Sequence, residues 1–61
     1  MNKQALLPLE GYPVILIKKD GYSISGILKN VWDDSITIVS DNALRVICFS
    51  EIAEIKKRGG Q

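Results

Sequence analysis

The side chains that could perform catalysis are few in this chain. Its 61 residues include no histidine and one cysteine, Cys48. General base catalysis would fall to lysines or carboxylates, and Asp33 and Asp34 are neighbours whose side chains tend to point apart. Cys48 lies in an apolar stretch without a histidine partner, which favours a buried structural thiol over a nucleophile. We therefore expect no enzymatic activity, no catalytic residue, no metal site and no cofactor.

Cationic and aromatic side chains offer a different chemistry, the binding of single-stranded nucleic acid. Lys18, Lys19 and Tyr22 flank an Asp-Gly turn, and Lys29 follows in the same polar and apolar alternation. Lysines on phosphates beside a tyrosine that stacks on a base would form a groove for single-stranded RNA. The alternative is that the lysines protect a strand edge while Tyr22 packs across the turn.

A second candidate RNA site is the segment with Trp32, Asp33 and Ser35. An indole that stacks on a base contributes roughly 1–3 kcal/mol, and a carboxylate can accept hydrogen bonds from a base edge. Two adjacent carboxylates, Asp33 and Asp34, would however repel phosphate. The alternatives are a core or subunit-interface role for Trp32 and solvated turn positions for the two aspartates.

Size and charge narrow the function classes. A chain of 61 residues and 6.8 kDa forms one small domain with a marginal core, and self-association is the remaining source of stability. Eight Lys and Arg against seven Asp and Glu give a net charge of +1, so any RNA contact must be local. No apolar stretch has the length of a signal peptide core or a membrane helix. We expect a cytoplasmic protein without a membrane partner.

The elements that would position these side chains are strands. Residues between Val14 and Ile55 are rich in β-branched types and are interrupted by turn signals. Gly26 lies inside a strand, which is typical of a sharp bend or a close backbone approach. Arg45 alternates with apolar residues and is expected to point into a pore or across an interface. The pattern predicts strands over 14–19, 22–29, 35–39, 44–49 and 53–57, with tight turns at 20–21, 30–34 and 40–42 and one 3₁₀ turn at 50–52.

This pattern predicts an all-β fold, a strongly bent, five-stranded antiparallel small barrel of SH3-like or Sm-like type. The single domain would comprise an N-terminal segment (1–12), the barrel (13–57) and a basic, flexible tail (58–61). The N-terminal segment would hold at most a short helical turn capped by Asn2, with Leu6, Leu7 and Leu9 covering an open barrel end. The predicted core consists of Val14, Leu16, Ile24, Leu28, Ile36, Ile38, Val46 and Ile52.

Two segments resemble the motifs of the Sm, LSm and Hfq proteins. Residues 18–28 are similar to the first Sm motif, with Gly21 and Gly26 at the family's spacing. The family continues with an aromatic residue and an aspartate, to which Trp32 and Asp33 are similar, although this chain has one extra residue after Gly26. A β-bulge would absorb it. Residues 46–55 are similar to the second Sm motif in length and apolar pattern.

The resemblance implies a bent five-stranded sheet whose fourth and fifth strands pair with neighbouring subunits in a ring that binds single-stranded RNA. We accordingly expect a homo-oligomer of about five to seven copies, because edge pairing would also satisfy exposed backbone groups. The interface residues expected are Val46, Ile47, Phe49 and Ile55.

One part of the family's chemistry is missing. Hfq carries a Tyr-Lys-His run at the end of the second motif, and other Sm proteins carry an Arg-Gly pair, whereas this chain has Cys48-Phe49-Ser50-Glu51. We therefore expect weak RNA binding near Trp32 and Asp33 and stronger binding on the face with Lys18, Lys19 and Tyr22. The alternative function is a small-barrel protein interaction or assembly module that does not bind RNA.

Overall fold

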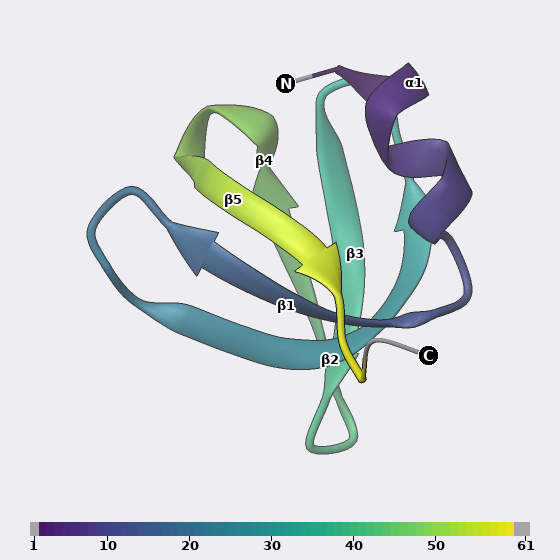
Figure 1. Cartoon of the computed structure of the whole chain (residues 1–61), viewed down its shortest axis with the longest axis vertical. Coiled ribbons are helices and arrows are strands. Elements are labelled where there is room, and N and C mark those ends of the chain that lie inside the picture. The colour runs from purple at the N-terminus through teal and green to yellow at the C-terminus, as the bar shows by residue number, and fades with distance from the viewer. Residues whose placement is uncertain (1, 60–61) are drawn as a thin grey trace.

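Five antiparallel strands form a single sheet after a short N-terminal helix (Figure 1). The computed structural model describes residues 2–59. Each strand lies within two residues of its predicted bounds, so the five-stranded antiparallel fold is confirmed. The strands are β1 (Pro13–Lys18), β2 (Ser23–Val31), β3 (Ser35–Ser40), β4 (Ala43–Cys48) and β5 (Ile52–Lys57), arranged in the order β4-β3-β2-β1-β5.

The sheet is bent but not closed. The first half of β2 pairs with β1, from Ile17↔Ser23 to Pro13↔Ile27, and the second half pairs with β3. Figure 1 shows β2 curving from its place beside β1 to its place beside β3. Strands β4 and β5 are the two edges of the sheet and do not pair with each other. The predicted closure into a barrel is therefore not found within one chain, and each edge strand keeps one side free.

Gly26 lies where β2 passes from one partner strand to the other. A Cβ atom at this position would collide with the carbonyl oxygen of Val39 and would lie 2.9 Å from Cγ2 of Ile38. The predicted close backbone approach is thus present, and only a residue without a side chain fits it.

The turns follow their predicted chemistry. Gly21 has φ 92°, and Tyr22 N–H donates to Oδ1 of Asp20 at 2.9 Å. Asp41 and Asn42 have φ 52° and 64° between β3 and β4, as a two-residue type I′ hairpin requires. The register of β2 against β3 shifts between Leu28 and Asn30. A β-bulge is therefore present after Gly26, in the segment where one was expected.

The core lies on the concave face of the sheet. All predicted core residues except Val46 are buried, and Val31 and Ile47 join them. Leu6 is 2% exposed and Leu9 packs against the same cluster, whereas Leu7 is 37% exposed. Two of the three N-terminal leucines therefore cover the end of the core, as predicted, and Leu7 does not.

Strand β4 presents the opposite face from the one predicted. Val46 is 69% exposed and Ile47 is 4% exposed, so the predicted core position of Val46 is wrong. Cys48, two residues after Val46, is on the same outer face and exposed, which corrects the prediction of a buried thiol. A shift of one residue in register reverses every side chain of a strand, and the unbroken apolar run 46–49 does not specify which face is inside.

The N-terminal segment forms one helical turn and a short extension. Helix α1 (Lys3–Leu6) begins at Asn2, whose Oδ1 accepts from Ala5 N–H at 2.9 Å, as predicted. The 3₁₀ turn η1 (Leu7–Leu9) includes Pro8, and a second 3₁₀ turn, η2 (Phe49–Glu51), joins β4 to β5. None of the helices within residues 2–59 has the length and apolarity to cross a membrane.

Candidate functional site

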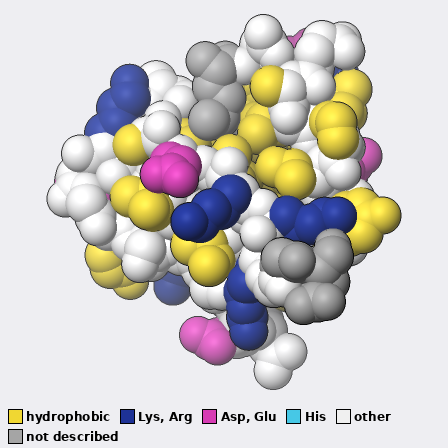
Figure 2. Space-filling view, viewed as in Figure 1, with side chains coloured by type: hydrophobic (Ala, Val, Ile, Leu, Met, Phe, Trp, Pro, Cys, Tyr) yellow, Lys and Arg dark blue, Asp and Glu magenta, His cyan; other side chains and the backbone are white. Residues whose placement is uncertain are grey.

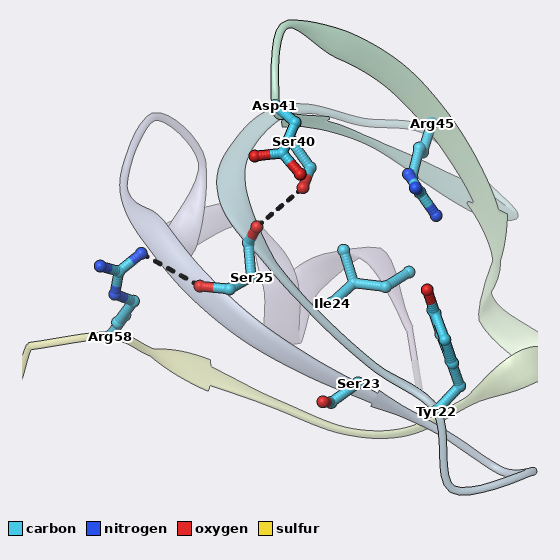
Figure 3. A pocket seen from close by; sticks show the side chains of 8 residues that line it. All are labelled: Tyr22, Ser23, Ile24, Ser25, Ser40, Asp41, Arg45 and Arg58. Atoms are coloured by element: carbon cyan, nitrogen blue, oxygen red, sulfur yellow. Dashed lines mark hydrogen bonds between the residues drawn. The ribbon is translucent and has the colours of Figure 1, made fainter.

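A cleft lies beside the N-terminal half of β2. Residues 23–26 of β2 pair with β1 only, and the β3–β4 hairpin meets this half of β2 at Ser25, which bonds to Ser40, and at Gly26, which lies against Val39. The cleft measures about 370 Å³, within the size range of small-ligand sites. Its lining is mostly polar and comes from four parts of the chain (Figure 3): Tyr22, Ser23, Ile24, Ser25, Ser40, Asp41, Arg45 and Arg58.

Hydrogen bonds fix one end of this cleft. Ser40 Oγ donates to the carbonyl oxygen of Ser25 at 3.0 Å, which ties the β3–β4 hairpin to β2. Arg58 Nη1 donates to Ser25 Oγ at 3.0 Å, and Arg58 N–H donates to the carbonyl oxygen of Pro13 at 2.9 Å. Arg58, the first residue of the predicted flexible tail, is therefore held in place, while residues 60–61 of that tail lie outside the described part of the chain.

Three side chains of this cleft have no partner among the described residues. Within residues 2–59, no hydrogen bond or ion pair involves the side chains of Tyr22, Asp41 or Arg45. Tyr22 is 57% exposed, and Figure 3 shows it beside Ile24, with Arg45 extending from β4 toward them. An exposed ring, a free guanidinium and a free carboxylate thus line one hollow and are available to a ligand.

The two predicted lysines lie in a different hollow. Lys18, Lys19 and Asp20 line it together with Ser50 and Glu51 of the β4–β5 connection. Lys18 Nζ lies 3.8 Å from Oε1 of Glu51, and Lys19 N–H donates to the Glu51 carbonyl oxygen at 2.9 Å. The two lysines thus line a different hollow from Tyr22, although Lys18 N–H donates to the Tyr22 carbonyl oxygen at 2.8 Å across the hairpin. Glu51 offsets part of the charge of Lys18.

The second predicted RNA site lies next to α1. Trp32 is 51% exposed, and its Nε1 donates to Thr37 Oγ1 at 2.9 Å. Asp33 pairs with Lys3 at 3.3 Å on the surface, whereas Ser35 is only 9% exposed. The indole is thus accessible for stacking, but the Ser35 side chain is not on the surface with it. Asp34 accepts Phe49 N–H at 2.9 Å through its backbone carbonyl, which suits a turn residue.

The remaining predicted residues are dispersed. Lys29 is exposed at the β2 bulge and lines neither hollow. Of the expected interface residues, Val46 is exposed on β4, Ile47 belongs to the core of its own chain, and Phe49 and Ile55 are half-buried against that core. Only Val46 of these four therefore offers a largely exposed side chain to a neighbour.

Exposed apolar side chains gather on the outer face near β4. Ile27, Val39 and Leu44 are consecutive cross-strand partners, and residues directly opposite each other share a face of the sheet. Val46 is the cross-strand partner of Thr37, and Thr37 Oγ1 accepts a hydrogen bond from Trp32 Nε1. We define the outer apolar face by four residues: Ile27, Trp32, Leu44 and Val46. Their exposed fractions range from 43% to 69%, and the face extends to the free edge of β4.

Sequence reasoning missed the two arginines of the cleft. Arg45 was assigned to a pore or an interface and Arg58 to the tail, because neither lies near Tyr22 in sequence. The available signal was the type I′ turn at Asp41-Asn42, which pairs Arg45 with Ile38 and thereby aligns it with the concave face. Figure 2 shows several Lys and Arg side chains across the middle of one face, with apolar side chains between them.

The chain was also compared with known proteins. No family model, no curated protein and no solved structure matches it.

Proposed function

We propose that this protein assembles through its two free sheet edges into a closed homo-oligomeric ring of Sm type, and that the ring binds single-stranded RNA. The sheet order carries the proposal. It leaves β4 and β5, the strands that join subunits in the family whose motifs the sequence resembles, as the two edges. Pairing β4 of one subunit with β5 of the next satisfies the backbone groups of both edges and repeats around an axis.

Assembly also supplies what a 61-residue chain lacks. A domain of this size buries only about 60% of its unfolded surface, and a chain with one cysteine forms no internal disulfide that would supplement the core. Leu44 and Val46 of β4 are 64% and 69% exposed, so a neighbouring strand on that edge would cover apolar surface as well as backbone groups.

For RNA, the cleft around Tyr22, Arg45 and Arg58 is the best candidate. An exposed tyrosine provides a stacking surface for a base, the Arg58 guanidinium attracts a neighbouring phosphate, and the Arg45 guanidinium is available for a further contact with the RNA. Each contact is weak alone. A ring would repeat the cleft in every subunit, and a single RNA strand that crosses several clefts gains affinity by avidity.

Salt-dependent RNA binding tests this assignment. We expect Tyr22→Ala to lower the affinity for single-stranded RNA with little change in the slope of log K against log salt, since no charge is lost. Arg58→Ala should lower both the affinity and the slope, because fewer counterions are released. Fluorescence anisotropy of a labelled oligonucleotide, titrated at several salt concentrations, measures both quantities.

The matched control is Lys18→Ala with Lys19→Ala, which removes two charges from the neighbouring hollow. We expect this double variant to change the slope modestly and to leave the contribution of Tyr22 intact. If the lysine variant loses most of its affinity for RNA and Tyr22→Ala loses none, the RNA site is the hollow lined by Lys18 and Lys19 and not the cleft.

The second candidate function is that of a protein-binding assembly module. The outer apolar face favours it, because exposed apolar side chains that adjoin each other mark surfaces for protein partners. If the wild-type protein binds no single-stranded RNA at low salt, this candidate becomes the better account.

A further inference from the structure

The cleft contains a specific set of donors and acceptors besides its stacking surface. The Arg45 guanidinium offers only donors in a planar fork, and the Asp41 carboxylate offers only acceptors. Neither side chain forms a hydrogen bond or an ion pair within the described residues, 2–59. The backbone of Asp41 is fixed by its position in the type I′ turn, and Arg45 lies on β4 two residues after the end of that turn. A ligand that contacts both side chains would present acceptors to Arg45 and donors to Asp41.

Among the four RNA bases, guanine has this arrangement. Its N7 and O6 are adjacent acceptors, which an arginine contacts with two hydrogen bonds. Its N1–H and 2-amino group are adjacent donors, which suit a carboxylate. Adenine places an amino donor next to N7 and would turn that donor toward the guanidinium. Cytosine offers two acceptors but only one amino donor, and uracil has single acceptors separated by one donor.

We propose that this cleft selects guanine in single-stranded RNA, with Arg45 donating to O6 and N7 and Asp41 accepting from N1–H and the 2-amino group. The inference rests on the proposed RNA-binding function and names its base preference. Tyr22, beside Ile24, provides the face on which the base stacks (Figure 3). Arg58 lies at the other end of the cleft, bonded to Ser25, where it is placed to contact phosphate rather than the base.

The test compares four labelled 12-nucleotide RNAs: oligo(U), and oligo(U) in which every fourth position is G, A or C. We expect the G-containing RNA to bind roughly tenfold more tightly than the other three, the range expected of one bidentate base contact. Replacing its guanines by 7-deazaguanine removes N7 and should abolish most of that preference. Replacing them by hypoxanthine removes the 2-amino group and should abolish the part that depends on Asp41.

Two variants separate base recognition from charge. Arg45→Gln should abolish the preference for the G-containing RNA, because a glutamine amide cannot donate hydrogen bonds to both O6 and N7 of guanine. Arg58→Gln removes the same charge from the same cleft and should weaken all four RNAs while their ranking stays unchanged. Arg45 is exposed, so the fold of the Arg45 variant, checked by circular dichroism, should match the wild type.

The outcomes distinguish this inference from the function on which it rests. If all four RNAs bind equally, or if the preference for G survives both 7-deazaguanine and Arg45→Gln, then guanine selection is overturned while RNA binding stands. If none of the four RNAs binds at low salt, both are overturned.

Discussion

Gly26→Val should unfold the protein at room temperature or bring it close to unfolding. The added Cβ alone would collide with the Val39 carbonyl oxygen and with Cγ2 of Ile38, and the two methyl groups of valine extend further. Backbone cannot move aside as a flexible side chain does, and overpacking of this kind costs about 3 kcal/mol or more. The whole stability expected of a 61-residue domain is roughly 3–9 kcal/mol.

Thermal and urea unfolding followed by circular dichroism measure this loss. Ser23→Val is the matched control, since it places the same side chain in the same strand at an exposed position. We expect the control to keep the wild-type midpoint within a few degrees. A Gly26→Val protein with an unchanged midpoint would show that β2 does not pass against β3 at this bend.

Val46→Asp should dissociate the proposed ring while each chain stays folded. Val46 is 69% exposed in the single chain, so a carboxylate there costs the isolated fold little. In a ring, the same side chain lies where β4 meets the next subunit, and burial of an unpaired charge costs several kcal/mol. We therefore expect the sedimentation coefficient to fall to that of the monomer, with a circular dichroism spectrum still typical of β-strands.

Ile27→Asp provides the comparison. Ile27 is 43% exposed on the same outer face, but it lies in the central strand β2, away from both edges. Its variant should keep the mass of the wild type. If Ile27→Asp dissociates the particle and Val46→Asp does not, the outer face rather than the β4 edge joins the subunits.

The strands and turns were predictable because local residue chemistry specifies them. Gly21 and Asp41-Asn42 supply the positive φ values of two tight turns, and alternation in β2 identifies its buried face. The position of Gly26 within a strand indicated the close approach that the structure contains. These features depend on residues within a few positions of each other.

The face of β4 and the composition of the cleft depend on longer-range geometry. The run 46–49 is apolar throughout, so its pattern fits either face, and only pairing with β3 decides that Ile47 is inside and Val46 outside. Arg45 and Arg58 are separated from Tyr22 by more than twenty residues in sequence. They line one cleft because the hairpin turns back toward β2 and because Arg58 bonds to Ser25.

The sequence also did not reveal whether the sheet closes into a barrel within one chain. Strand count and a bend favour a barrel, but closure requires β4 and β5 to meet, and the order β4-β3-β2-β1-β5 keeps them at opposite edges. A ring would provide each edge with a partner from another subunit. The same free edges therefore explain why the single chain stays open and why we propose that it assembles.

Sedimentation velocity of the wild-type chain at micromolar concentration tests this central proposal most directly. We expect one particle with a mass about five to seven times the 6.8 kDa of the chain, which does not grow as concentration rises because a closed ring has no free edge. A stable 6.8 kDa monomer would contradict the proposed ring, as would a mass that increases continuously with concentration.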